Sequence, residues 1–192
     1  MNLPTGDDLL DRKIDVFFSH LDQNGDGQLE TADALALAAR IVAYVGEPFS
    51  SPKAHALFDA LEIFWQAVNR HMDPVEDGLI NPDEWRDGMR RAFAMNPIGF
   101  EEGFRPLAEA TLNLLDRDND GRVTTVEFAA FQRASGTSPG NSIYAFSRLD
   151  RDGDGALSVA ELLTAWREFY TSFEANAPGN WLYGDIWYEY GL

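Results

Sequence analysis

The sequence lacks cysteine altogether, so no disulfide framework stabilises it and a reducing compartment is the expected setting. Long apolar runs are also missing: the longest, residues 34–45, is interrupted by Arg40 and falls short of the roughly 18–20 residues that a membrane helix needs. The first residues show neither a signal-peptide pattern nor a second-position glycine for myristoylation. We therefore expect a cytoplasmic protein that does not insert into membranes.

Positive charge is scarce, with 15 Lys and Arg against 32 Asp and Glu and a formal net charge of −17. Such a chain repels phosphate backbones and anionic membrane surfaces, which excludes nucleic acid and membranes as partners and favours cations. No nucleophilic triad, phosphate-binding glycine loop or zinc-ligand spacing occurs, so we do not expect an enzyme. With 192 residues and 12% aromatic side chains, the chain is long enough to bury a sizeable core.

The acidic residues are concentrated in three stretches of twelve residues, 22–33, 116–127 and 150–161. Each has oxygen-bearing side chains at positions 1, 3, 5 and 12 and glycine at position 6. Ca²⁺ takes six to eight oxygen ligands at about 2.3–2.6 Å, so alternate residues of a tight loop point inward and the glycine permits the turn. The pattern resembles the EF-hand calcium loop and predicts three bound Ca²⁺ ions.

Loop position assigns a role to each candidate metal ligand: position 7 offers its backbone carbonyl, position 9 acts mostly through water, and position 12 closes the cage. The candidates in the first loop are Asp22, Asn24, Asp26, the carbonyl of Gln28, Glu30 and Asp33. Those in the third loop are Asp116, Asp118, Asp120, the carbonyl of Arg122, Thr124 and bidentate Glu127. Those in the fourth loop are Asp150, Asp152, Asp154, the carbonyl of Ala156, Ser158 and bidentate Glu161.

Asp33 at position 12 departs from the glutamate that closes the other two loops. Its side chain is one methylene shorter, so bidentate closure around a large ion requires the loop to tighten. Glu30 at position 9 offers a compensating oxygen. We expect the first site to be less selective for Ca²⁺, with Mg²⁺ as a competitor.

A fourth stretch, residues 73–84, keeps acids at positions 1, 5 and 12 and glycine at position 6, but position 3 is Val75. EF-hands pair through a short β-bridge at position 8, and that position is apolar in all four stretches: Leu29, Ile80, Val123 and Leu157. We interpret this second loop as a structural partner that has lost most of its metal affinity. Glu76 and Asn81 are the nearby oxygens that could restore it.

Apolar residues recur at helical spacing on both sides of each loop, as in Ile14, Phe17 and Leu21 before the first. This predicts an all-α fold of four EF-hands in two pairs, packed into one compact globular unit. We expect an N-terminal pair over residues 1–96 and a C-terminal pair over 97–173. The aromatic segment 174–192 is expected to fold back onto the core, with docking to a partner as the alternative.

Three features together resemble the sarcoplasmic calcium-binding proteins and their calerythrin-like bacterial relatives: four hands with the second degenerate, a length near 190 residues, and the segment Pro178-Gly179-Asn180-Trp181. The resemblance implies a compact molecule whose two pairs hide their hydrophobic clefts. It implies an intracellular, high-affinity Ca²⁺ buffer or transporter. No protein target is indicated, and a monomer is expected.

Two other functions remain open. A Ca²⁺ sensor would expose an apolar groove to a target protein, but such grooves are rich in methionine and this chain has only four. A photoprotein would bind a luciferin with histidine, tryptophan and tyrosine from both halves of the chain. Here His20, His55 and His71 all fall in the N-terminal half, where we expect ordinary surface or packed residues.

Overall fold

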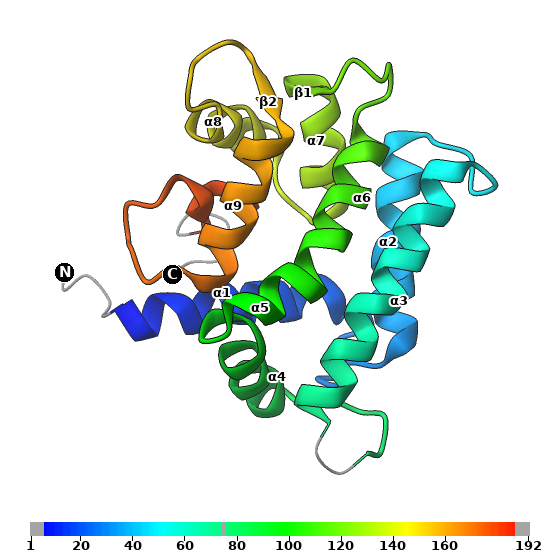
Figure 1. Cartoon of the computed structure of the whole chain (residues 1–192), viewed down its shortest axis with the longest axis vertical. Helices are drawn as coiled ribbons and strands as arrows, with labels where there is room; N and C mark the ends of the chain where they lie inside the picture. Colours follow the sequence, from blue (N-terminus) through cyan, green and yellow to red (C-terminus); the bar gives the residue numbers. More distant parts are fainter. Residues whose placement is uncertain (1–5, 74–75, 187–192) are drawn as a thin grey trace.

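The computed structural model describes residues 6–73 and 76–186, which form mostly helices (Figure 1). The helices are α1 Gly6–Leu21, α2 Thr31–Val45, α3 Pro52–Met72, α4 Pro82–Met89, α5 Pro97–Gly99, α6 Arg105–Leu115, α7 Thr125–Ala134, α8 Pro139–Leu149 and α9 Val159–Thr171. The two short strands are β1 Arg122–Thr124 and β2 Ala156–Ser158. The predicted all-α fold is confirmed. Among the described helices, none combines the length and apolar character needed to cross a bilayer.

The four helix–loop–helix units are joined in pairs through their loops. In the N-terminal pair, Leu29 and Ile80 exchange two backbone hydrogen bonds of 2.9 and 3.0 Å. In the C-terminal pair, β1 and β2 run antiparallel with Val123 opposite Leu157. All four of these position-8 side chains are buried, so the predicted β-bridges are confirmed.

The helices that leave the loops begin at residues that cap them. Asn81 accepts hydrogen bonds from the N–H groups of Asp83 and Glu84, at 3.0 and 3.1 Å, and Pro82 fills the first helical position. Thr124 and Ser158 cap α7 and α9 in the same way, each in a capping box with the acid three residues later. The residues at loop positions 9 and 12 therefore fix both the loop and the start of the next helix.

The two pairs pack face to face: α2 lies against α7, α3 against α6 and α1 against α9 (Figure 1). Aromatic rings from both pairs fill this interface, the seam between the two pairs. Phe17 and Tyr170 have ring centroids 4.9 Å apart, Phe104 and Tyr170 4.4 Å, and Phe64 and Phe104 4.8 Å. The hydrophobic faces of both pairs are thereby removed from water, as expected for one compact unit.

The connection between the pairs is helical. Two π-helical turns, Arg90–Ala94 and Phe100–Phe104, flank the short α5, which begins at Pro97. The sequence predicts that Pro106 starts or kinks the following helix, and Pro106 is the second residue of α6, just after the second π-helical turn. Proline has no N–H to donate, so an irregular turn directly before it is expected.

The segment after α9 folds back over the C-terminal pair. A 3₁₀ turn covers Pro178–Trp181, and Leu182, Tyr183 and Ile186 are buried. The Tyr183 ring lies 4.9 Å from Phe169 and 5.6 Å from Phe131, centroid to centroid. The remaining aromatic residues of this segment, within 187–192, lie outside the described residues.

Candidate metal centres

Three aspartates converge in each of the loops that precede β1 and β2. Carboxylate oxygens of Asp116, Asp118 and Asp120 lie within 4.8 Å of one another, and those of Asp150, Asp152 and Asp154 do the same. Like charges this close repel by a few kcal/mol per pair at an effective dielectric near 20, a penalty that a divalent cation removes. In the described part of the chain, no other three His, Cys, Asp or Glu side chains converge in this way.

Backbone N–H groups hold these carboxylates in place. In the fourth loop Asp150 accepts from Gly153 and Gly155, at 2.9 and 3.0 Å, Asp152 accepts from Asp154 at 3.1 Å, and Asp154 accepts from Ala156 at 3.0 Å. Gly155 has a φ of +87°, the left-handed conformation that the turn requires. With their positions fixed by the loop itself, the carboxylates still have free lone pairs for a hard cation. The donor set fits Ca²⁺.

The third loop repeats this arrangement. Asp116 accepts from Asp120 and Gly121, at 3.1 and 3.0 Å, and Asp120 accepts from Arg122 at 2.8 Å. Gly121 has a φ of +83°. The two C-terminal loops are therefore nearly equivalent in backbone and in ligand placement.

The position-12 glutamates lie across the loop entrances. Glu127 and Glu161 each accept one hydrogen bond from the N–H at loop position 2, that of Arg117 at 2.9 Å and that of Arg151 at 2.8 Å. Burial acts to raise the pKa of Glu161, but its hydrogen bonds from Ser158, Arg151 and Asp152 outweigh this and leave the pKa below its ordinary value. The carboxylate is thus ionised at neutral pH.

The first loop has the same turn but a different closure. Asp22 accepts from Gly25 and Gly27, at 2.9 and 3.0 Å, and Asn24 accepts from Asp26 at 2.8 Å. The buried Asp33 accepts only locally, from the Glu30 N–H at 3.0 Å.

The hydrogen bond donated by the backbone N–H at position 2 also differs in the first loop. The Gln23 N–H at position 2 donates to the Leu21 carbonyl at 2.7 Å, whereas the equivalent N–H in the third and fourth loops donates to the position-12 glutamate. The shorter acid therefore makes no such contact. The weaker Ca²⁺ selectivity that the sequence predicts for this site stays a prediction.

The second loop retains the turn framework. Asp73 accepts from Asp77 and Gly78, at 3.2 and 2.9 Å, and Glu84 accepts from the Asn81 N–H at 3.0 Å. Glu76 adopts a φ of +56°, which is unfavourable for a residue other than glycine. Val75, the residue expected to remove most of the metal affinity, lies outside the described residues.

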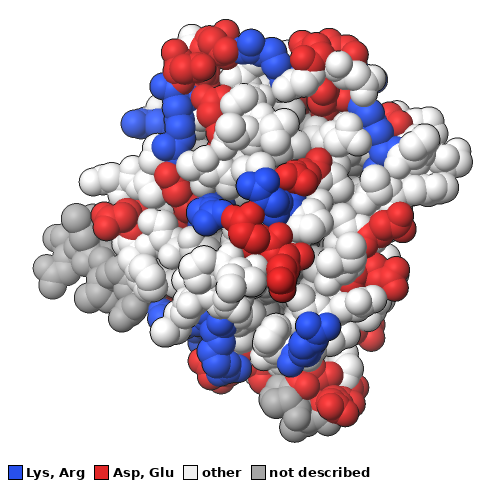
Figure 2. All heavy atoms as spheres, viewed as in Figure 1, with Lys and Arg blue, Asp and Glu red and all other residues white. Residues whose placement is uncertain are grey.

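Basic side chains are interspersed among the acidic groups at the end of the molecule where Figure 1 places the third and fourth loops (Figure 2). The guanidinium of Arg122, on β1, forms an ion pair with Asp154 of the fourth loop. The hydrogen bond from Arg122, followed by that from the Ala156 N–H, lowers the pKa of Asp154. The sequence predicts a role for Arg122 only through its carbonyl, because the loop pattern does not report on side chains that reach the paired loop.

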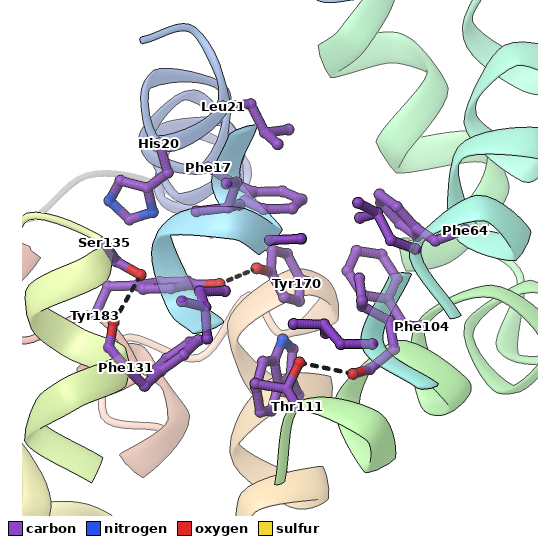
Figure 3. A pocket seen from close by; sticks show the side chains of 17 residues that line it. Phe17, His20, Leu21, Phe64, Phe104, Thr111, Phe131, Ser135, Tyr170 and Tyr183 are labelled. Atoms are coloured by element: carbon purple, nitrogen blue, oxygen red, sulfur yellow. Dashed lines mark hydrogen bonds between the residues drawn. The ribbon is translucent and has the colours of Figure 1, made fainter. Parts of the chain in front are cut away.

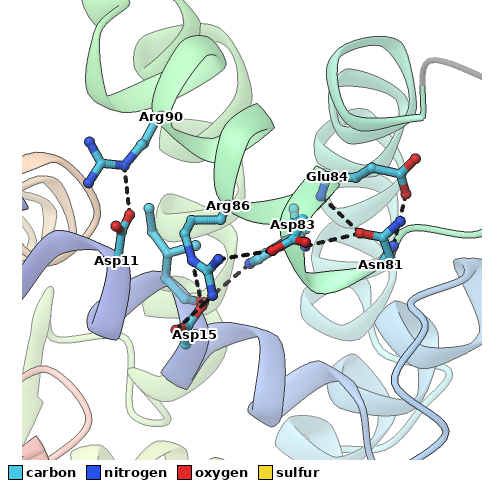
Figure 4. A network of polar contacts seen from close by, with 9 residues as sticks. Asp11, Asp15, Asn81, Asp83, Glu84, Arg86 and Arg90 are labelled. Carbon is cyan, nitrogen blue, oxygen red and sulfur yellow. Dashed lines mark hydrogen bonds and ion pairs between the residues drawn. The ribbon is translucent and has the colours of Figure 1, made fainter. Parts of the chain in front are cut away.

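Ion pairs connect α1 and α4, the first and last helices of the N-terminal pair (Figure 4). Arg86 of α4 makes a bidentate contact with Asp15 of α1 at 2.9 and 3.1 Å, and Arg90 contacts Asp11 at 2.6 Å. Arg86 also contacts Asp83 at 3.1 Å. These contacts bind the helix that enters the first loop to the helix that leaves the second.

The two lysines of the chain both donate to backbone carbonyls across the seam, which sequence analysis did not foresee. Lys53 of α3 donates to the carbonyl of Asp116, the first residue of the third loop. Lys13 of α1 is fully buried and donates to the carbonyls of Glu168 and Ser172, at 3.0 and 2.7 Å, and to Oδ1 of Asn180 at 3.0 Å. The only sequence signal for Lys13 is its position in the apolar stripe of its helix.

A small cavity of about 40 Å³ lies in the seam (Figure 3). His20, Trp166, Tyr170 and Tyr183 line it together with apolar side chains, and the hydroxyls of Tyr170 and Tyr183 are hydrogen-bonded. Burial, together with the smaller effect of the Arg40 charge, lowers the pKa of His20 to about 3, so the imidazole is neutral. His55 and His71 are exposed.

Comparisons with known proteins agree with this geometry. The EF hand family model matches residues 107–132 and 143–165. Calerythrin of Saccharopolyspora erythraea is 29% identical over 154 residues, covering 80% of this chain and 87% of the relative. Luciferin-binding protein of Renilla reniformis is 35% identical over 184 residues, covering 91% and 93%. The solved structure of a Streptomyces coelicolor calcium-binding protein is 29% identical, with a TM-score of 0.73, and covers 85% of this chain and 98% of that one.

Proposed function

This chain belongs to the EF-hand family of calcium-binding proteins, and from that premise we propose that it is a calcium buffer with three working loops, the first, third and fourth. The main support is that three aspartates converge in each of the third and fourth loops, where backbone N–H groups hold them in place. The first loop shares their turn. We assign the ligands by loop position, as the sequence predicts them, and divide the chain into pairs 1–96 and 97–173 with a packing segment 174–192.

Several features favour a buffer over a sensor. The apolar faces of the two pairs lie against each other, and Leu182, Tyr183 and Ile186 are buried against the C-terminal pair. A sensor needs a groove that opens to a target helix, and here both the opposite pair and the chain's own tail already occupy the apolar faces.

Isothermal titration with CaCl₂ tests the proposal. We expect three Ca²⁺ per chain, and millimolar Mg²⁺ should weaken mainly the site closed by Asp33, since Mg²⁺ accepts the tighter loop. The double variant Glu127→Gln and Glu161→Gln should leave one strong site. Asp83→Asn, an exposed change in the second loop, serves as the control and should leave three.

A stoichiometry of four would instead show that the second loop binds, and no uptake would refute the proposal. A fluorescent dye for exposed apolar surface separates buffer from sensor: its signal should not rise when Ca²⁺ is added to the folded protein. A calcium-dependent rise would favour the sensor.

A second candidate function is the binding of an aromatic small molecule in the seam cavity. The observation that favours it is the convergence of His20 with Trp166, Tyr170 and Tyr183, which brings together groups from both halves. The luciferin-binding protein at 35% identity is a relative with such a ligand in its name. Against it, about 40 Å³ holds roughly three waters, far below the 300–1,000 Å³ of ordinary ligand sites.

Coelenterazine is the probe for this alternative, because a coelenterazine-binding protein from Renilla muelleri is among the solved structures that share this fold. If the cavity admits it, tryptophan fluorescence should be quenched at micromolar concentrations, and Tyr183→Phe should weaken the effect. Tyr44→Phe, at an exposed tyrosine, is the matched control. Because the cavity is small, we expect no saturable quenching in any of the three proteins.

A further inference from the structure

The ion pair between Arg122 and Asp154 joins the two C-terminal loops. Arg122 stands at position 7 of the third loop, and Asp154 at position 5 of the fourth. The strand register places Arg122 opposite Ser158. From there its side chain crosses to the neighbouring loop and contacts a candidate ligand of the other site.

Arg122 takes part in both loops through different groups. Its N–H donates to Oδ1 of Asp120 at 2.8 Å, and its carbonyl is the position-7 ligand assigned to the third site. Its guanidinium interacts electrostatically with Asp154, Asp120 and Asp152, so it faces carboxylates of both loops. Asp154 is held at one oxygen by the Ala156 N–H and at the other by this guanidinium.

Only the third loop has a charged side chain at position 7. Position 7 is Gln28 in the first loop, Leu79 in the second and Ala156 in the fourth, none of which carries charge. The third loop therefore supplies a cation to the fourth, and the fourth supplies none in return.

We propose that Arg122 acts as a built-in counter-ion that lowers the affinity of the fourth site for Ca²⁺. The inference rests on the proposed function, because it requires Ca²⁺ to bind among Asp150, Asp152 and Asp154. A fixed positive charge against one of these carboxylates opposes the entry of a divalent cation. Both partners are roughly two-fifths exposed, so salt should screen the effect.

Site-resolved NMR tests this inference. The amides of Gly121 and Gly155 donate to Asp116 and Asp150, both at 3.0 Å, so their resonances report on the third and fourth sites separately. In calcium-buffered solutions of low ionic strength, Arg122→Gln should lower the Ca²⁺ midpoint at Gly155 roughly three- to tenfold. The midpoint at Gly121 should fall by a smaller factor, because the guanidinium contacts Asp154 directly but makes no hydrogen bond to Asp120. Added salt should shrink the difference.

Two further variants sharpen the test. Arg122→Lys keeps the charge and should stay near wild type. Arg133→Gln removes an equal charge from α7, where the side chain donates to the Ala129 carbonyl of its own helix, and should have little effect.

An unchanged or raised midpoint at Gly155 in Arg122→Gln would overturn the inference, since a raised midpoint means that Arg122 positions the ligand. An equal response in Arg133→Gln would overturn it too, by showing a general charge effect. If Gly155 of the unchanged protein does not respond to Ca²⁺, the proposed function fails at this site, which is a distinct result.

Discussion

Removal of Ca²⁺ with a chelator should lower the melting temperature by about 15–30 °C. At free Ca²⁺ about 100-fold above the dissociation constant, each site stabilises the folded state by roughly 2.7 kcal/mol, and three sites by about 8 kcal/mol. For a chain of this size, each kcal/mol corresponds to about 2–4 °C. The apo protein is left with uncompensated aspartate clusters in the third and fourth loops, and we expect it to be loosened. Scanning calorimetry with and without EGTA measures the shift.

The double variant Glu127→Gln and Glu161→Gln supplies the control for this experiment. It should melt at a lower temperature than wild type in Ca²⁺ and respond less to EGTA, since two of its sites are weakened. Equal melting temperatures of wild type in Ca²⁺ and in EGTA would contradict the prediction, because binding to the folded state must stabilise it.

Replacement of Lys13 by methionine should reduce the free energy of unfolding by about 2–4 kcal/mol at neutral pH, or roughly 5–15 °C in melting temperature. Methionine fills most of the volume but donates no hydrogen bond. The carbonyls of Glu168 and Ser172 and the side chain of Asn180 would each lose the donor that Lys13 provides. Arg12→Met, which removes the neighbouring charge from a partly exposed side chain, is the matched control and should cost little.

Lys13 should also make the free energy of unfolding depend on pH. Burial lowers the pKa of Lys13 to about 7, while the charge of Glu168 acts to raise it, against 10.5 for an ordinary lysine. Between these values the unfolded chain binds more protons than the folded one, so stability from this group should rise with pH over that window. Chemical denaturation at pH 7 and pH 10 should show the gain in wild type and not in Lys13→Met. A parallel response in both proteins would assign the dependence to other groups.

The candidate calcium loops could be located in the sequence because a metal cage of this kind is local. Ligands, turn glycine and closing acid all fall within twelve residues, so spacing alone encodes them, and the apolar residue at position 8 encodes the pairing of loops. The different closure of the first loop follows from the single methylene that separates Asp33 from a glutamate.

Contacts across the seam could not be predicted in this way. The partners of Lys13 are 155 to 167 residues away in the chain, so its burial depends on how the pairs dock. The cavity brings His20 against Tyr183, with ring centroids 4.5 Å apart, although the two lie at opposite ends of the sequence. The ion pair of Arg122 with Asp154 depends on the strand register, which spacing within one loop does not specify.

The aromatic seam has a consequence for how the molecule comes apart. Phe17 and Phe64 from one half contact Tyr170 and Phe104 from the other. Separation of the halves would therefore expose many aromatic rings to solvent at the same time. Neither half is expected to fold stably as an isolated fragment. After proteolytic cleavage in the segment that connects the pairs, the two fragments should stay associated and elute together in size-exclusion chromatography. Unfolding is therefore expected to be a single concerted event.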